Sequence, residues 1–353
     1  MKTYYVGMDV HKATIVIAVL DANGKVVSQT IIETSTQTVR NFFQSLRGEI
    51  HITFEEGNHA AWLYDVVKPL VKRVVVCNPK HNHLLKQGSK SDRIDARKLA
   101  ELLRLKALKP VYHGEHGTRT LKELVRCYEC LVKDLSRVQN RLKALYNSQA
   151  IRNRGRELYH LSKRESWIQK QENAGRRMRA ELFFRQMDEL KALKRAARRA
   201  MITESRRHEA QSILSQVPEL GLVRVAQIIA TVDSPFRFRT KRPFWAYLGL
   251  AVETRSSADH ELTNGRVSRR KVKIETRGLN EDYNRRLKSV FKSAATHACS
   301  CGVYKEYFEK LVAGGMRPEM ARLSVARKLA AAVLAVWKKG QSFDEGMIMS
   351  RAA

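Results

Sequence analysis

Four acidic residues near the start of the chain have the types and spacing of a divalent-metal site. Asp92 and Asp95 lie three residues apart in a segment that reads as the start of a helix, so both carboxylates share one helical face. Two like charges this close repel each other unless a cation or a shared proton holds them. Asp9 and Glu55 each end a strand-like run. Brought together by a fold, these four acids would form a metal site for cutting phosphodiesters.

Each acid also has an ordinary structural explanation when it is taken alone. Asp9 could cap a turn, and Asp92 could be the N-cap of a helix whose first turn holds Asp95. His11 and His59 lie near the acids in the sequence, but such residues are more often structural or solvent-facing than ligands. The occurrence of all four acids in this order favours the metal site.

The charge of the chain indicates a polyanionic partner. Its 353 residues include 66 lysines and arginines against 35 acids, a formal net charge of +31. Such an excess favours nucleic acid through counterion release, with a membrane-surface or ribosome-associated protein as the alternatives. No apolar run reaches transmembrane length, and the N-terminus lacks the pattern of a signal peptide. We therefore expect no membrane partner and a cytoplasmic, nucleoid-associated location with access to DNA or RNA.

The five cysteines do not indicate a disulfide framework, because their number is odd and the expected compartment is reducing. Cys127 and Cys130 could form a split zinc site with Cys299 and Cys301. However, the first pair lies in a strongly helical stretch without the turn glycines of zinc knuckles. We expect ordinary buried cysteines instead.

The elements that must position the acids read as an α/β domain over residues 1–110. The patterns predict strands over 4–10, 14–20, 25–32, 52–55 and 74–77, and helices over 38–46 and 60–71. The first three strands form an antiparallel meander, and strand–helix alternation follows. This order is the one expected of a ribonuclease H-like sheet, in which the first strand carries a carboxylate at its centre.

A regular apolar seam opens the middle segment, residues 111–210. Its members alternate at spacings of three and four residues, which predicts a coiled coil or a long helical hairpin, and we favour a helix that pairs with another chain. The seam consists of Leu121, Leu124, Tyr128, Leu131, Leu135, Val138, Leu142 and Leu145. The basic stretch 152–207, with Arg198 and Arg199, is either a solvated helix face or a phosphate-tracking surface. The overall charge favours the second.

Residues 211–353 read as a mainly α-helical C-terminal domain. Pro218-Glu219-Leu220-Gly221 before a helix resembles the hairpin of helix-hairpin-helix DNA-backbone binders, a weak signal in isolation. Residues 236–250 supply core side chains. A polar loop over 253–259 and a basic run over 266–271 follow, and helices resume through 337.

These segments together resemble the DEDD-type insertion-sequence transposases, whose N-terminal domain is similar to the RuvC Holliday-junction resolvase. The resemblance covers nearly the whole chain. It rests on Val6–Lys12, the strand end at Glu55, Asn78–Lys80, Ser91–Ala100, Val217–Gly221, Tyr247–Leu250 and Ala326–Leu329. The Asp92–Ala100 run is the most specific of these motifs.

The resemblance implies that Asp9, Glu55, Asp92 and Asp95 bind Mg²⁺. Glu56 is a rival to Glu55, because the family's usual spacing between the glutamate and the next glycine is shortened here. Strand alternation places Glu55 with Thr53 on one face and Glu56 on the other.

The resemblance also implies a serine nucleophile, at Ser256 or Ser257. The family usually has proline where Val252 stands and glycine where Ala258 stands, so both serines remain candidates. Guanidinium groups pair bidentately with phosphate oxygens, so Arg255 and Arg269, followed by Arg270, are expected to contact the reacting nucleic acid.

The implied protein is a recombinase that cleaves and exchanges DNA strands of a mobile element. Its implied partners are donor and target DNA, a structured noncoding bridge RNA, and further copies of itself in a dimer or tetramer. The alternatives are a metal-dependent Holliday-junction-type nuclease that uses water, and a non-catalytic nucleic-acid binder on a ribonuclease H-like scaffold. Metal-dependent formation of a covalent protein–DNA adduct distinguishes the recombinase from both.

Overall fold

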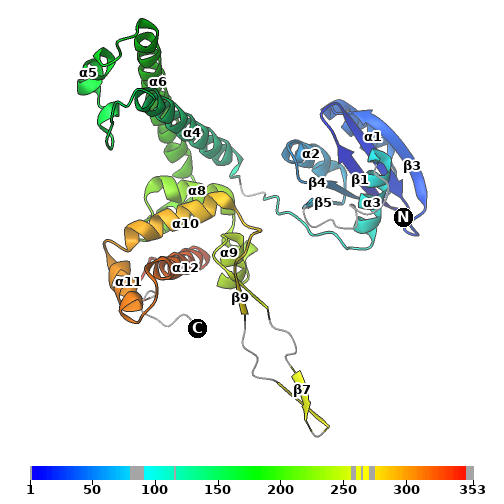
Figure 1. The fold of residues 1–353 in the computed structure, drawn as a ribbon. Helices are drawn as coiled ribbons and strands as arrows, with labels where there is room; N and C mark the ends of the chain where they lie inside the picture. Colours follow the sequence, from blue (N-terminus) through cyan, green and yellow to red (C-terminus); the bar gives the residue numbers. More distant parts are fainter. Residues whose placement is uncertain are drawn as a thin grey trace. The chain divides into compact units, whose positions relative to one another are not determined.

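The computed structural model describes residues 2–79, 91–114, 117–255, 260–263, 265–269 and 275–346. The chain divides into two compact units, Met1–Gly114 and Glu115–Ala353. The first is a mixed α/β sheet domain and the second is mainly helical (Figure 1). Within the described ranges, every helix is too short or too polar to cross a membrane.

A five-stranded sheet in the order β3-β2-β1-β4-β5 forms the N-terminal unit. β1 (Thr3–Val10), β2 (Thr14–Leu20) and β3 (Val26–Glu33) are antiparallel neighbours. β4 (Glu49–Glu55) and β5 (Arg73–Cys77) continue from β1 as parallel strands. The predicted meander and the strand–helix alternation after it are thereby confirmed.

The burial of each strand follows from its place in the sheet. β2 is an almost continuous apolar run and is buried on both faces. β3 at the edge alternates between half-buried and exposed residues, because only one of its faces is covered. The core on one face is formed with α1 (Thr36–Ser45) and α2 (Ala60–Val67), and η1 (Lys68–Leu70) follows α2. On the other face lies α3 (Asp92–Arg104).

Two long helices, α4 (Arg119–Asn147) and α6 (Ala174–Ser205), form a hairpin in the second unit. The helices are antiparallel, since the start of α4 shares a core with the end of α6, and the end of α4 packs with the start of α6. The short elements η3 (Glu157–Tyr159), η4 (Leu161–Lys163) and α5 (Arg164–Gln169) connect them.

The apolar seam of α4 is therefore covered within the chain. Leu135 and Leu142 are buried in one cluster with Phe184 and Met187 of α6. Of the two predicted arrangements, the structure contains the helical hairpin. Pairing of this seam between two chains is not confirmed and stays a prediction.

Short helices around the buried α12 complete the second unit. Their shared core is apolar and includes the base of the α4–α6 hairpin. The Pro218–Gly221 turn joins two of these helices, α7 and α8, but its assignment as a helix-hairpin-helix element that binds a DNA backbone is not confirmed and stays a prediction. The helices are α7 (Glu209–Leu214), α8 (Leu222–Val232), α9 (Lys241–Tyr247), α10 (Arg285–Ala298), α11 (Val303–Ala313) and α12 (Pro318–Lys339), with η5 (Pro235–Arg237) after α8.

The prediction of a polar loop and a basic run between α9 and α10 was wrong where it left out strands. β6 (Val252–Arg255) pairs with β9 (Glu275–Leu279), and β7 (His260–Thr263) pairs with β8 (Arg266–Arg269). Thr263 pairs with Arg266 at the end of this ladder, and Gly265 has φ +73°. An Asn-Gly pair between alternating residues is a strong hairpin signal, so the sequence contained this information.

Candidate metal centre

Asp9 and Glu55 stand at the carboxyl ends of neighbouring parallel strands. Met8 of β1 pairs with Phe54 of β4, and both side chains are fully buried in the core beneath α1 and α2. Successive side chains of a strand point to opposite faces. Asp9 and Glu55, the next residues, therefore belong to the face that α3 covers.

α3 lies very close to β1 because residue 7 is glycine. A Cβ atom on Gly7 would lie 2.1 Å from the carbonyl oxygen of Ala96 and 2.5 Å from the backbone nitrogen of Ala100. Since close-packed atoms do not approach so closely, a larger residue would force the helix away from the strand. This contact fixes how close the first turn of α3 lies to the carboxyl end of β1.

The first turn of α3 carries two carboxylates and is capped by a neighbour. The Ser91 side chain is the N-cap and accepts a hydrogen bond from the backbone N–H of Ile94, 3.3 Å away. The alternative in which Asp92 caps the helix is therefore wrong. Asp92 and Asp95 lie in the first turn, where the helix dipole favours negative charge.

His11 stands between the strand and helix carboxylates. Its Nε2 lies 3.2 Å from Oδ2 of Asp9 and 3.4 Å from Oδ2 of Asp92. These three groups each offer one ligand atom, all within 4.8 Å of one another. The structure thus brings two of the four predicted acids together and adds a histidine that the sequence pattern had not favoured as a ligand.

The surroundings of Asp9 disfavour the ionised form of its carboxyl group. Burial raises the pKa of Asp9, and the charges of Asp92 and Asp95 raise it further, while His11 lowers it. The net direction is upward, mainly because of burial, and a bound cation would stabilise the ionised carboxylate.

Asp95 gives a second sign that this site suits a cation. Its Oδ1 atom is buried and has no hydrogen-bond partner among the described residues. A buried carboxylate oxygen ordinarily finds a donor or a metal, because leaving it without a partner is costly. Together with the close group of Asp9, His11 and Asp92, this oxygen atom fits a divalent cation.

Glu55 and Glu56 have different surroundings. The Glu56 carboxylate lies 2.7 Å from Nε2 of His113, whose ring stacks on Tyr64 of α2. It is therefore engaged away from α3. Glu55 belongs to the α3 face, although its carboxylate is not in the close group of Asp9, His11 and Asp92. His59 precedes α2 and packs edge-on against Trp62.

The predicted serines and arginines belong to other parts of the chain than this centre. Ser256, Ser257 and Arg270 lie outside the described residues. Arg255 ends β6 and Arg269 ends β8. These positions belong to the second unit.

Arg198 and Arg199 lie on the exposed side of α6. Arg198 lines a cavity of about 710 Å³ together with Arg224, Arg285 and the Gly221 end of the turn before α8. The predicted hairpin and the predicted basic helix thus share one hollow. Arg199 is not among the residues that line it.

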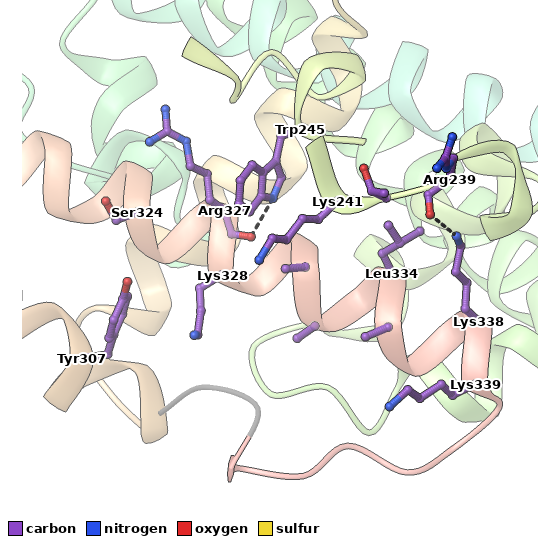
Figure 2. A pocket seen from close by; sticks show the side chains of 14 residues that line it. Arg239, Lys241, Trp245, Tyr307, Ser324, Arg327, Lys328, Leu334, Lys338 and Lys339 are labelled. Atoms are coloured by element: carbon purple, nitrogen blue, oxygen red, sulfur yellow. Dashed lines mark hydrogen bonds between the residues drawn. The ribbon is translucent and has the colours of Figure 1, made fainter. Parts of the chain in front are cut away.

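Sequence reasoning missed a second basic cavity, of about 690 Å³, between α9, α11 and α12 (Figure 2). Trp245 donates a hydrogen bond to the carbonyl oxygen of Arg327, and Lys328 lies over the ring of Tyr307. Burial lowers the pKa of Lys328, and the nearby charge of Lys241 lowers it further. The lining has no acid among the described residues; its cations are Arg239, Lys241, Arg327, Lys328, Lys338 and Lys339.

Comparison with known proteins agrees with this geometry. A family model described as a transposase, of the DEDD type named for IS110, matches residues 6–148, which include all four acids. A second model, the transposase IS116/IS110/IS902 family, matches residues 211–309. A transposase for insertion sequence element IS1533 from Leptospira borgpetersenii is 32% identical over 150 residues, or 39% of this chain. The match spans 42% of that relative's length. The chain belongs to the IS116/IS110/IS902 family of DEDD transposases.

Proposed function

We propose that this protein is a DNA transposase that cleaves strands at the ends of a mobile element and joins them to target DNA. The observation that carries the proposal is the convergence of Asp9, His11 and Asp92 on the α3 face of the sheet. Asp95, in the same first turn of α3, has a buried Oδ1 for which the described residues offer no hydrogen-bond partner. The strand order supports a ribonuclease H-like, RuvC-like assignment of the N-terminal unit.

Asp9, Glu55, Asp92 and Asp95 would hold the metal, with Glu55 preferred to Glu56 because Glu56 is engaged with His113. A bound Mg²⁺ would polarise the scissile phosphate and stabilise the leaving oxygen. The chain's own contribution is to keep the carboxylates of β1 and α3 close to one another. The Gly7 contact fixes α3, and His11 holds Asp9 and Asp92 near each other.

A serine of the second unit, Ser256 or Ser257, would act as the nucleophile. In this step an Oγ–phosphorus bond forms, one phosphodiester P–O bond breaks, and the hydroxyl proton is lost to a base. Arg255, Arg269 and Arg270 flank these serines in the sequence and would stabilise charge on the phosphate. Family membership supports this assignment.

Nucleic acid would bind along the basic surfaces of the second unit. The cavity lined by Lys241, Arg327 and Lys328 combines cations with two aromatic rings, which suits a sugar–phosphate backbone with an adjacent base. Arg198 and Arg199 of α6 would extend this contact. A structured noncoding bridge RNA beside the DNA, and assembly into a dimer or tetramer, complete the proposal.

Covalent trapping of DNA tests the reaction. The purified protein is incubated with labelled DNA that carries the element's ends, together with any co-purified RNA, with and without Mg²⁺. We expect a Mg²⁺-dependent band of protein-linked DNA on a denaturing gel. Asp9→Asn should abolish it while binding is retained, and the double variant Ser256→Ala/Ser257→Ala should abolish it too.

Asp134→Asn is the matched control, since it removes the same charge from an exposed ion pair with Arg137 on α4. Full adduct formation by Asp9→Asn would refute the metal centre. Cleavage without an adduct would favour the water-dependent nuclease, and binding without cleavage would favour the non-catalytic binder. Sequencing of the bound RNA tests the RNA partner separately: one discrete structured species supports it, and only heterogeneous cellular RNA contradicts it.

A further inference from the structure

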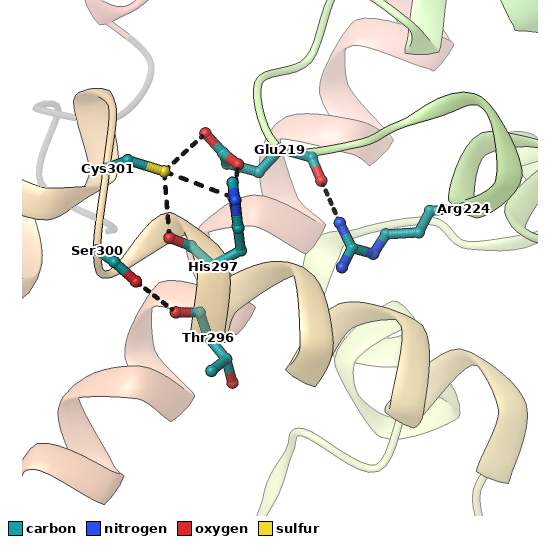
Figure 3. Close-up of polar contacts among 6 residues, drawn as sticks. All are labelled: Glu219, Arg224, Thr296, His297, Ser300 and Cys301. Carbon is teal, nitrogen blue, oxygen red and sulfur yellow. Dashed lines mark hydrogen bonds and ion pairs between the residues drawn. The ribbon is translucent and has the colours of Figure 1, made fainter. Parts of the chain in front are cut away.

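Three side chains that bind transition metals meet in the second unit, far from the acidic centre in sequence. Glu219 lies in the turn before α8, His297 in the last turn of α10, and Cys301 just before α11. Sγ of Cys301 lies 3.5 Å from Nδ1 of His297 and 3.7 Å from Oε1 of Glu219. The Glu219 carboxylate also contacts Nδ1 of His297 (Figure 3).

The cysteines therefore group differently from the sequence-based alternatives. Cys127 and Cys130 are exposed on α4, so the expectation that they are buried was wrong. Cys301 lies beside a glutamate and a histidine, and its group does not include the other cysteine pair. Cys299 is not part of the cluster.

The geometry does not match a catalytic cysteine–histidine–acid arrangement. In such an arrangement the nucleophile and the acid contact different ring nitrogens, because one nitrogen takes the nucleophile's proton while the N–H of the other is held by the acid. Here the thiol and the carboxylate both converge on Nδ1 of His297. Three potential ligand atoms that lie within 4.8 Å of one another can instead surround an ion.

The two sulfur separations suit tetrahedral zinc, whereas the Glu219 carboxylate, which contacts Nδ1 of His297 directly, would have to move back as an ion enters between them. With Zn–S near 2.3 Å and Zn–N near 2.0 Å, a tetrahedral angle separates sulfur from nitrogen by about 3.5 Å. The Cys301–His297 distance is 3.5 Å. A mixed sulfur, nitrogen and oxygen donor set favours zinc over Mg²⁺ or Ca²⁺, which prefer oxygen ligands alone.

A buried hydroxyl beside the cluster lacks a partner. Tyr304, in the first turn of α11, is fully buried, and its hydroxyl has no hydrogen-bond partner among the described residues. It lies close enough to Glu219 for that carboxylate's charge to act on it. A buried polar atom of this kind calls for a partner beyond those that the described residues offer, such as a ligand or water.

The local backbone holds the carboxylate in place. Glu219 has φ +69°, which is uncommon for a residue with a side chain, and its carbonyl oxygen accepts a hydrogen bond from Arg224, 2.9 Å away. Gly302 follows Cys301 with φ +69°, and a Cβ there would lie 3.2 Å from Oε1 of Glu219. The chain thus leaves room for the carboxylate next to the thiol.

We propose that Glu219, His297 and Cys301 form a zinc site that fastens the turn before α8 to the junction of α10 and α11. Cys301 binds as the thiolate, its proton being released to solvent. The three protein ligands leave a fourth position for water, which would also give the Tyr304 hydroxyl a partner. The site would stiffen the same turn whose Gly221 end lines the Arg198 cavity.

Cobalt titration of the full-length, chelator-treated protein tests the site. We expect one equivalent of Co²⁺ to produce a thiolate-to-cobalt charge-transfer band with the visible bands of tetrahedral cobalt, and one equivalent of Zn²⁺ to remove them. The acidic centre offers only oxygen and nitrogen atoms, so it cannot give the thiolate band. Asp9→Asn should therefore leave the band unchanged, which separates this test from that of the transposase reaction.

Two variants and one control decide the ligands. Cys301→Ser should lose the thiolate band, and Cys299→Ser, two residues away, should keep it. His297→Asn should weaken cobalt binding by more than tenfold, because even an outer-sphere partner contributes about 10- to 100-fold. The His297 side chain is 63% exposed, so this variant should fold even if Cys301→Ser does not. Absence of the band in the wild type, or its persistence in Cys301→Ser, would overturn the proposal.

Discussion

Replacing Gly7 with alanine should separate the two halves of the acidic centre. The added Cβ would start 2.1 Å from the Ala96 carbonyl oxygen, and real Cβ atoms essentially never come within 3.0 Å. The helix backbone must therefore retreat by at least the difference, 0.9 Å. Both obstructing atoms belong to the backbone of α3, so no side chain can rotate away to relieve the clash.

Two magnitudes follow from that displacement. Adding a methyl group to a tightly packed contact lowers the free energy of unfolding by about 1–3 kcal/mol, and the backbone obstruction places Gly7→Ala near the upper limit. Misplacing catalytic groups by about 1 Å costs about 100-fold in rate. Since α3 carries Asp92 and Asp95 while β1 carries Asp9, the retreat acts directly on the distances between ligands.

The assay pairs stability with activity. Hydrogen exchange read on peptides from β1 and α3 gives the free energy of opening, and the rate of Mg²⁺-dependent adduct formation gives the catalytic effect. Gly57→Ala is the control, because Gly57 follows the other acidic strand and a Cβ there would meet no atom of the described residues within 4 Å beyond its chain neighbours. Unchanged exchange and an unchanged rate in Gly7→Ala would show that the α3 contact does not position the acids.

Three other predictions concern charge, binding and packing. Burial raises the pKa of Asp9, so the ionised carboxylate destabilises the folded state at a pH above that pKa. In metal-free protein, Asp9→Asn should therefore raise the free energy of unfolding at neutral pH, measured by urea melts. At acid pH the variant should show no gain in stability, because wild-type Asp9 is already protonated there. Lys241→Ala should reduce the slope of log affinity against log salt for nucleic acid by about 0.7–0.9, whereas Lys305→Ala, in an exposed pair on α11, should not. Leu142→Ala should cost about 2–5 kcal/mol in denaturant melts because the side chain is fully buried in the α4–α6 hairpin, while Leu182→Ala, on the exposed side of α6, should change stability by less than about 0.5 kcal/mol.

Much of the N-terminal unit could be predicted because its signals are local. The meander, the parallel strands and the start of α3 each follow from periodicity and turn residues within a few positions. The spacing of Asp92 and Asp95 on a first helical turn is likewise a property of one segment. The signal for the Asn264-Gly265 hairpin is just as local, so its omission from the prediction reflects no limit of the sequence.

The contacts that make a site were decided by tertiary structure. Nothing in the neighbourhood of Gly7 indicates that the backbone of residues 96 and 100 must pass over it. The position of His11 between Asp9 and Asp92 depends on that same approach. Similarly, the heptad seam of α4 specifies only that a partner helix is needed, and the fold supplies α6 from the same chain.

The sequence by itself determined which residues could bind a metal and which segments would present them, because side-chain chemistry and periodicity are fixed by residue type. Only the tertiary structure decided which ligands share a centre. Glu219 and Cys301 are separated by 82 residues, and their meeting follows from the packing of α8 and α10 in a common core. Packing brings together residues whose separation along the chain carries no signal of their contact, so metal sites of this kind emerge from the fold.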